Sequence, residues 1–161
     1  MVTVQDIAKY ASKHDACKPG LKRILKSKSD AELIALYKRN IDFCLDNDFP
    51  EKNLLKGFQK AGIYVDESSE VTNTGFVVLL GKSNASIQLT GYNVMQLFVK
   101  NESTANVNVS GNAYAVIDCF DDTDLAVSAL DKSKVLVNVY GNSRVVSTGN
   151  VRVINKGKER Y

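Results

Sequence analysis

Apolar residues alternate with other residues in a ten-residue pattern through the second half of the chain. In each block of ten over residues 71–150, the fifth, seventh and ninth positions are nearly all apolar, as in Ala85, Ile87 and Leu89. Alternation of this kind is typical of short β-strands that bury one face. The pattern fades in the last block, where Ser147 stands at an aliphatic position. The sequence therefore predicts one short strand in each block.

The first position of each block carries a residue type that builds turns. Glycine, asparagine and aspartate tolerate a positive φ better than other residues do. These positions are Gly81, Gly91, Asn101, Gly111, Asp121, Asp131 and Gly141. A strand followed at a fixed interval by a turn residue is the mark of a stacked repeat.

The outward positions add a period of twenty residues. They are mostly polar in the blocks that start at 81, 101 and 121, for example Asn106 and Asn108, and largely apolar or aromatic in the blocks between. A coil of two strands would stack like blocks on like, giving one polar and one apolar outer sheet. We therefore predict a β-solenoid of about four 20-residue coils. The alternative is an antiparallel β-meander or barrel, whose outer face would then alternate in stripes.

The first 64 residues have the periodicity of helices. Thr3 caps a first short helix, Pro19-Gly20 interrupts the pattern, and a short basic helix with Leu21 and Ile24 follows. Ser29 and Glu32 form a capping-box pattern at the start of the clearest helix. Its apolar face is Leu33, Ile34, Tyr37, Ile41, Cys44 and Leu45.

A last helix and a stop complete this region. Pro50 suits the first turn of a helix that carries Leu54, Leu55 and Phe58, and Gly62 suits its end. The fold class is therefore α+β. Its parts are a helical region over 1–64, a polar junction over 65–72, a solenoid over 73–155 and a frayed basic tail over 156–161.

An apolar outer sheet on a solenoid needs a cover, because large bare apolar patches are rare on monomers. One interpretation is that the helices pack over it through Leu33, Ile34, Tyr37 and Ile41. The other is that part of the sheet is an interface for a protein partner or for a second copy, since aromatic residues dominate such contacts. The expected anchors are Phe76, Phe98, Tyr114, Phe120 and Tyr140.

Charge is concentrated near the beginning of the chain. The net charge is +3, yet residues 1–28 hold seven Lys/Arg against two Asp. We expect Lys18, Lys22, Arg23 and Lys26 to lie on one side of a short helix, where they would contact nucleic acid or another anionic surface. A solvated amphipathic face is the alternative.

The residues that carry chemistry form no recognisable constellation. Cys17, Cys44 and Cys119 have no metal or redox spacing, and His14 is the one histidine. We therefore expect no metal, no cofactor and no enzymatic activity. Asp118, with Asp121, Asp122 and Asp124, forms the one carboxylate cluster, and a carbohydrate-active solenoid enzyme with Asp118 in a cleft is the alternative.

No apolar run is long enough to span a membrane, and the first residues lack the basic and apolar segments of a signal peptide. This predicts a cytoplasmic protein, or a virion protein if a phage encodes it.

Two resemblances extend this interpretation. The segments 105–112 and 134–142 resemble the GIN-type adhesin-head β-solenoids of Bacteroidetes. The whole chain resembles small helix-plus-β-repeat proteins of gut Bacteroidetes and their phages or mobile elements, through the segments 36–38, 43–45, 48–50, 62–66 and 78–83. Together with the solenoid, this resemblance implies a structural or interaction protein that does not catalyse a reaction, such as a capsid decoration or fibre component. The alternative is an intracellular protein that binds a host macromolecule or nucleic acid through its basic helices.

Overall fold

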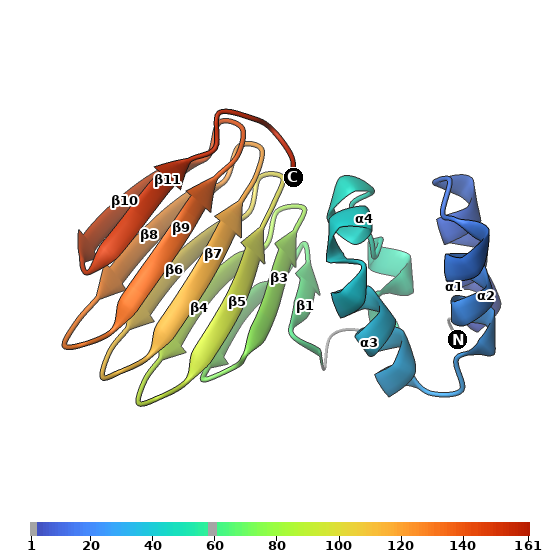
Figure 1. The fold of residues 1–161 in the computed structure, drawn as a ribbon, viewed down its shortest axis with the longest axis horizontal. Coiled ribbons are helices and arrows are strands. Elements are labelled where there is room, and N and C mark those ends of the chain that lie inside the picture. Colours follow the sequence, from blue (N-terminus) through green and yellow to red (C-terminus); the bar gives the residue numbers. More distant parts are fainter. Residues whose placement is uncertain (1–2, 58–60) are drawn as a thin grey trace. The chain divides into compact units, whose positions relative to one another are not determined.

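The computed structural model describes residues 3–57 and 61–161 of the chain (Figure 1). The chain forms two compact units, Met1–Ala61 and Gly62–Tyr161. The first unit is helical and the second is built from parallel strands, so the α+β class is confirmed. The boundary lies just before Gly62, whose φ of 80° suits the end of the helical unit.

The helical unit begins with a capped helix, as Thr3 predicts. The Thr3 hydroxyl accepts a hydrogen bond from the Asp6 amide, and the Asp6 carboxylate accepts one from the Thr3 amide. This reciprocal pair satisfies two of the amides that a helix start leaves open. The elements of the unit are α1 (Val4–Lys13), α2 (Lys18–Lys26), α3 (Asp30–Arg39), α4 (Ile41–Asp46) and the 3-10 helix η1 (Lys52–Gly57).

Two helix boundaries differ from the sequence prediction. Pro19 and Gly20 lie inside α2, because proline fits the first turn of a helix, where its missing amide has no intrahelical partner. The long helix from Ser29 divides at Asn40 into α3 and α4. The Asn40 side chain donates to the Leu36 carbonyl at 2.7 Å and ends α3 there.

Other features of the helical unit follow the sequence more closely. The Ser29 hydroxyl accepts from the Glu32 amide at 3.3 Å, as predicted, but the Glu32 carboxylate accepts from Lys28 instead of Ser29. The segment after Pro50 forms η1 in place of an α-helix, and the expected contribution of Phe58 lies outside the described residues. The buried apolar residues of the described part are Ile7, Ala8, Ala11, Tyr37, Cys44, Leu45 and Phe49.

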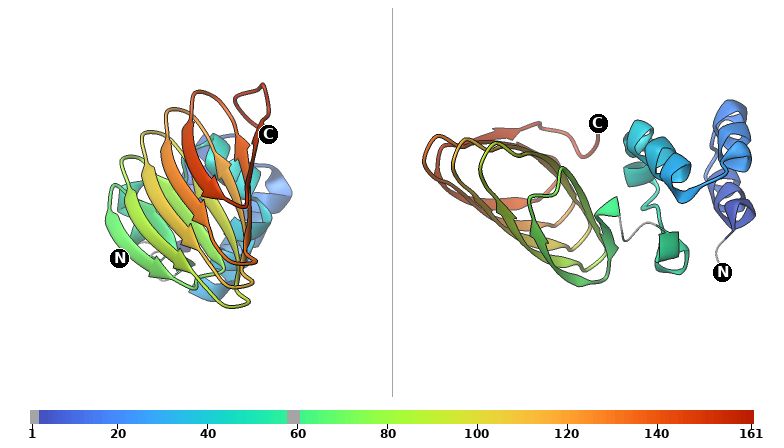
Figure 2. Two further views of the ribbon diagram at one scale, coloured as in Figure 1. Left: turned by 90° about the vertical axis from the view of Figure 1, so that its left-hand side faces the viewer. Right: turned by 90° about the horizontal axis from the view of Figure 1, so that it is seen from below.

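The second unit is a two-sided parallel β-solenoid. Sheet A has the order β1-β3-β5-β7-β9-β11 and sheet B the order β10-β8-β6-β4-β2. All strand pairs in the described residues are parallel, which excludes the meander. From β3 to β10, paired residues are twenty positions apart in the sequence. Figure 2 shows the sheets as opposite walls of one coil. The strands are β1 (Ile63–Val65), β2 (Ser68–Thr72), β3 (Phe76–Leu80), β4 (Asn84–Leu89), β5 (Val94–Val99), β6 (Thr104–Val109), β7 (Tyr114–Cys119), β8 (Asp124–Ala129), β9 (Lys134–Val139), β10 (Arg144–Gly149) and β11 (Val151–Asn155).

The solenoid begins earlier than the sequence pattern indicates. Residues 65–72, expected to be a polar junction, include the end of β1 and all of β2. Ile63 pairs with Val78 and Ser68 with Asn84, so this first coil is shorter than twenty residues and falls outside the ten-residue columns. β2 has one buried apolar residue, Val71, among polar outward residues, and its composition therefore looks like that of a loop.

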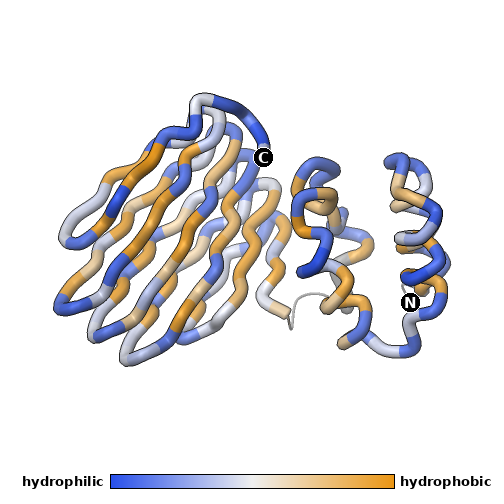
Figure 3. The backbone as a smooth tube through the Cα atoms, viewed as in Figure 1, coloured by the Kyte–Doolittle hydropathy of each residue, from blue (hydrophilic) through white to orange (hydrophobic). Residues whose placement is uncertain are grey.

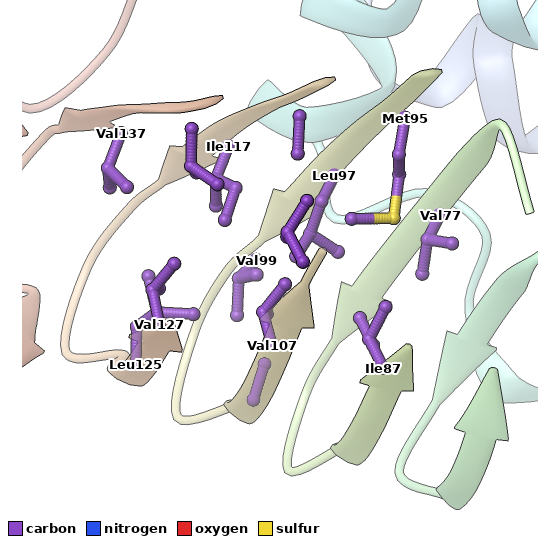
Figure 4. Packing of buried hydrophobic residues seen from close by; sticks show 14 of the residues in the cluster. Val77, Ile87, Met95, Leu97, Val99, Val107, Ile117, Leu125, Val127 and Val137 are labelled. Carbon is purple, nitrogen blue, oxygen red and sulfur yellow. The ribbon is translucent and has the colours of Figure 1, made fainter. Parts of the chain in front are cut away.

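Inward side chains of the two sheets form the core (Figure 4). Val77, Leu97, Ile117 and Val137 stack as one column of sheet A, and all four are at most 1% exposed. Burying an aliphatic side chain of this size stabilises a fold by about 1.5–3 kcal/mol. Colouring by hydropathy shows the same alternation along the strands (Figure 3).

The corners of the coil carry the turn residues that the sequence predicts. All seven block-opening positions have a positive φ, between 58° and 71°. At several of these corners an acidic or amide side chain also binds the neighbouring coil. The Asn101 side-chain oxygen accepts from the Gly81 amide at 2.8 Å, and Asp131 accepts from the Gly111 amide at 2.9 Å.

Candidate interaction surfaces

The five aromatic anchors expected from the sequence all belong to sheet A or to the corners that follow its strands. Phe76 and Phe98 are buried, with ring centroids 5.7 Å apart, and Phe120 stacks on Tyr140 at 4.7 Å. Tyr114 alone among them is exposed, at 40%. The sequence correctly places these residues on one sheet, but four of them are not available to a partner in this structure.

Residues 156–161, which we call the strap, cover part of this aromatic surface. The Tyr161 ring meets Phe120 and Tyr140 edge-on, with centroid distances of 5.3 and 5.4 Å. Backbone bonds join Lys156 to the Val139 carbonyl and Gly141 to the Lys158 carbonyl. The expected frayed tail is therefore held against sheet A by these contacts, although its residues stay exposed and Tyr161 is 47% exposed.

Asp118 has a defined structural role in this arrangement. Its Oδ2 accepts a hydrogen bond from the Tyr161 hydroxyl, and its Oδ1 accepts one from the Asn138 side chain, each at 2.6 Å. Both carboxylate oxygens are thus already engaged. Asp118 anchors the strap and bridges two coils.

The fold separates the acidic residues that are close in sequence. Asp118 lies on sheet A, Asp121 at the next corner and Asp124 on sheet B. Asp121 accepts from the Asn101 amide and lies 3.5 Å from the Lys100 ammonium. Asp124 binds the Arg144 guanidinium through two bonds, which lower the pKa of that carboxyl. These carboxylates therefore lie on different parts of the coil, each with its own hydrogen-bond or ion-pair partners.

An exposed aromatic patch lies at the start of β5 and β7, on the coil edge opposite the strap. Tyr92 is 85% exposed and Val94 61% exposed, and Val94 pairs in register with Tyr114. We call these three residues the Tyr92 patch. Tyr92 is not predictable as a surface residue from the sequence pattern, because it stands in a turn and the alternation of strand positions assigns it no face.

The outer face of sheet B is polar, as the twenty-residue period predicts. Outward residues of β4, β6 and β8 include Ser86, Asn106 and Ser128. The Ser128 hydroxyl donates a hydrogen bond to the side-chain oxygen of Asn108 in the neighbouring coil at 2.8 Å. The two outer faces of the solenoid therefore differ in chemistry.

The predicted basic residues lie on α2, which carries no acidic residue. Lys18, Lys22 and Lys26 are one turn apart, and Arg23 is next to Lys22. No carboxylate of residues 3–57 or 61–161 forms an ion pair with any of these four side chains. Their positive charge is therefore not neutralised within the described chain.

The helical unit also contains an apolar groove with a volume of about 400 Å³. Residues of α1 to α4 line it, with Arg23 among the polar ones. The apolar lining includes Ile7, Ile24, Leu33, Leu36, Tyr37 and Phe43. Sequence periodicity indicated the apolar faces of these helices but not the space between them.

The remaining candidate chemistry has structural explanations. His14 stacks on Tyr10 at 4.3 Å and bonds the Asn47 side chain at 3.1 Å. No cluster of three His, Cys, Asp or Glu side chains within the described ranges could hold a metal ion. None of the described helices combines the length and apolar character needed to cross a membrane.

Burial raises the pKa of the Cys44 thiol to about 12 and that of the Cys119 thiol to about 11. Both side chains are buried, whereas Cys17 is exposed. Because the thiolate is the reactive form, the two buried cysteines are poor nucleophiles.

Comparison of the chain with protein-family models, curated proteins and solved structures found no match.

Proposed function

We propose that this protein is a structural and interaction protein that does not catalyse a reaction. In this proposal the solenoid is a rigid platform, and its Tyr92 patch binds a protein partner, with a second copy of the chain as the first candidate. The phage resemblance suggests an accessory component of a virion, such as a capsid decoration or fibre protein. We therefore propose both that the protein forms an oligomer and that it is a component of a virion.

The exposure of the Tyr92 patch carries this proposal. Tyr92 is 85% exposed and Val94, two residues further on, is 61% exposed, so both leave apolar area in water. Val94 and Tyr114 are fixed by the pairing of β5 with β7. Tyrosine is enriched at protein interfaces because it contributes a large contact area with few rotatable bonds. A preformed surface of this kind binds with little loss of conformational entropy.

Oligomerisation tests the proposal directly. We expect the wild-type protein to sediment as an oligomer and Val94→Glu to weaken association by at least about tenfold, because a carboxylate at the interface would have to lose its hydration. Sedimentation velocity over a range of protein concentrations measures this. Asn106→Glu on sheet B is the matched control and is expected to leave association unchanged.

A wild-type protein that stays monomeric at all concentrations and is absent from purified phage particles would contradict the proposal. A Val94→Glu protein that associates as strongly as the wild type would contradict the role of the Tyr92 patch specifically.

Two alternatives from the sequence stay predictions. A carbohydrate-active enzyme would need Asp118, whose two carboxylate oxygens bind Tyr161 and Asn138 in this structure. An anionic macromolecule such as nucleic acid would bind the cationic side chains of α2, where Lys22 and Lys26 are one turn apart and form no ion pair with a described carboxylate.

A further inference from the structure

The strap lies on the surface of the solenoid and leaves its own residues in solvent. In Figure 1 the chain leaves β11 and turns back across the ends of the neighbouring sheet A strands, where the Gly141 amide donates to the Lys158 carbonyl at 3.2 Å. All six residues of the strap are exposed, whereas Ile117 and Val137 of β7 and β9 are completely buried. Segments with few buried contacts open locally at a lower free energy than the core does. The strap therefore opens more easily than the strands beneath it.

Gly157 provides a point about which the strap can turn. The Lys156 amide donates to the Val139 carbonyl at 2.9 Å, so pairing with the neighbouring coil continues up to this residue. Gly157 comes next, with a φ of 64° and nothing within 4 Å of the position of an added Cβ. Residues 158–161 can consequently leave sheet A while β11 stays paired with β9.

The strap covers an aromatic stack that would otherwise face solvent. Phe120 and Tyr140 continue the outward positions of β7 and β9, yet they are only 2% and 5% exposed. The Tyr161 ring lies edge-on against both, and its hydroxyl donates to Asp118 at 2.6 Å. When Tyr161 leaves, apolar ring area returns to water and one Asp118 oxygen loses its donor. A surface of this kind favours association.

The covered stack is continuous with the Tyr92 patch along one strand. The outward residues of β7 are Tyr114, Val116 and Asp118, and Phe120 follows them. Tyr114 belongs to the Tyr92 patch and is exposed, and Val116 and Asp118 are half-buried. An open strap therefore extends the exposed surface from the start of β7 to the corner after it.

We propose that the strap is a displaceable cover that restrains self-association of the solenoid. With the strap closed, a second copy of the chain contacts the Tyr92 patch alone. With the strap open, the contact extends along β7 to Phe120 and Tyr140, and the larger apolar area binds more tightly. The choice of a second copy rests on the function proposed above, because the two surfaces are continuous.

Substitution of Tyr161 in the full chain tests this proposal. We expect Tyr161→Ala to lower the dissociation constant for self-association by at least about tenfold in sedimentation velocity. In the monomer at low concentration, we expect the Gly141 amide to exchange hydrogen at least about tenfold faster, because its acceptor on Lys158 is released, while β7 amides keep their rates. Tyr161→Phe keeps the ring and is expected to give intermediate values. Glu159→Ala, an exposed substitution within the strap, is the matched control and is expected to change neither quantity.

Three results would overturn the proposal. Faster exchange of the β7 amides in Tyr161→Ala, equal to that of Gly141, would mean that the strap is an integral part of the coil. A released strap with unchanged association would show that it restrains nothing. Weaker association of Tyr161→Ala would mean that the strap itself joins two copies.

Val94→Glu, added to the wild type and to Tyr161→Ala, separates this proposal from that of the Tyr92 patch. If Val94→Glu weakens association in the wild type but Tyr161→Ala does not strengthen it, the patch binds a second copy and the strap has no restraining role. If Tyr161→Ala strengthens association and Val94→Glu has no effect in either background, the restraint by the strap is supported and the role of the patch is refuted.

Discussion

Single residues at the corners of the solenoid combine two tasks. Each corner needs a backbone with positive φ, and several corners also use a side chain to satisfy an amide of the adjacent coil. Asn101 and Asp131 do both, since they adopt φ values of 65° and 58° and accept from Gly81 and Gly111. Glycine corners supply only the conformation. The mixture of Gly, Asn and Asp at the block-opening positions therefore follows from backbone sterics and hydrogen bonding together.

Gly111→Ala tests the steric part of this explanation. Gly111 has φ of 71°, and a Cβ there would lie 3.0 Å from the backbone nitrogen of Gly91. We expect the free energy of unfolding of the solenoid to fall by about 1–3 kcal/mol, from left-handed strain and from this close contact. Urea denaturation followed by circular dichroism measures it.

Gly157→Ala is the matched control for this prediction. Its φ of 64° brings the same conformational strain, but nothing lies within 4 Å of the added Cβ. We expect a smaller loss of about 1 kcal/mol. Equal losses at the two positions would show that the neighbouring coil does not constrain Gly111.

At the scale of elements, strand register distributes the chemistry of the chain. Because side chains alternate along a strand and coils repeat every twenty residues, Asp118 and Asp124 occupy different sheets although they are close in sequence. The twenty-residue repeat also places Phe120 and Tyr140 at equivalent positions of neighbouring coils, where their rings stack and Tyr161 of the strap contacts both. Alternation predicted these faces from the sequence. It did not predict the strap, because a single aromatic ring after a basic segment has no periodicity.

Tyr161 is expected to account for much of the strap's stability. Tyr161→Ala removes two ring contacts and the hydrogen bond to Asp118, and we expect it to lower the free energy of unfolding by about 1–2 kcal/mol. Tyr161→Phe keeps the ring and is expected to cost about half as much. Thermal unfolding followed by circular dichroism compares them.

The exposed Glu159 gives the control substitution for the strap, since Glu159→Ala leaves the Tyr161 contacts in place. An Ala variant at Tyr161 that is as stable as the wild type would mean that the strap contributes nothing to the solenoid.

At the scale of the whole molecule, the two units differ in charge and in core. Residues 1–61 carry twelve Lys/Arg and eight Asp/Glu, a net charge of +4, whereas residues 62–161 carry nine and ten, a net charge of −1. The solenoid buries every inward position of β4 to β9. In the helical unit, α2 has only partly buried apolar residues such as Leu21 and Ile24, and a groove lies beside it. The two units are therefore suited to different tasks.

We expect backbone amides of the two units to exchange hydrogen at different rates. We expect amides of β4 to β9 to exchange only through global opening of the solenoid, and amides of α2 to exchange through local opening that costs several kcal/mol less. Mass spectrometry of peptic fragments of the full chain measures both. Equal protection of α2 and the solenoid strands would contradict this difference.

Features that depend on local periodicity are predictable from the amino-acid sequence alone. Alternation and turn residues predicted the strands, the corners and the twenty-residue coil, because each depends on residues that are neighbours along the chain or one coil apart. Helix caps at Thr3 and Ser29 were predictable for the same reason. The first coil was not predicted, because its strands pair at a shorter sequence separation than those of the following coils.

The exposure of these residues to a partner depends on tertiary contacts, which the sequence pattern does not contain. Four of the five predicted aromatic anchors are buried, and Asp118 is occupied by Tyr161. The Tyr92 patch and the groove of the helical unit are accessible instead, and neither was predicted from the sequence. Exposure and cavities depend on contacts between residues that are distant along the chain, such as Tyr161 with Phe120, and no repeat in the sequence encodes those distances.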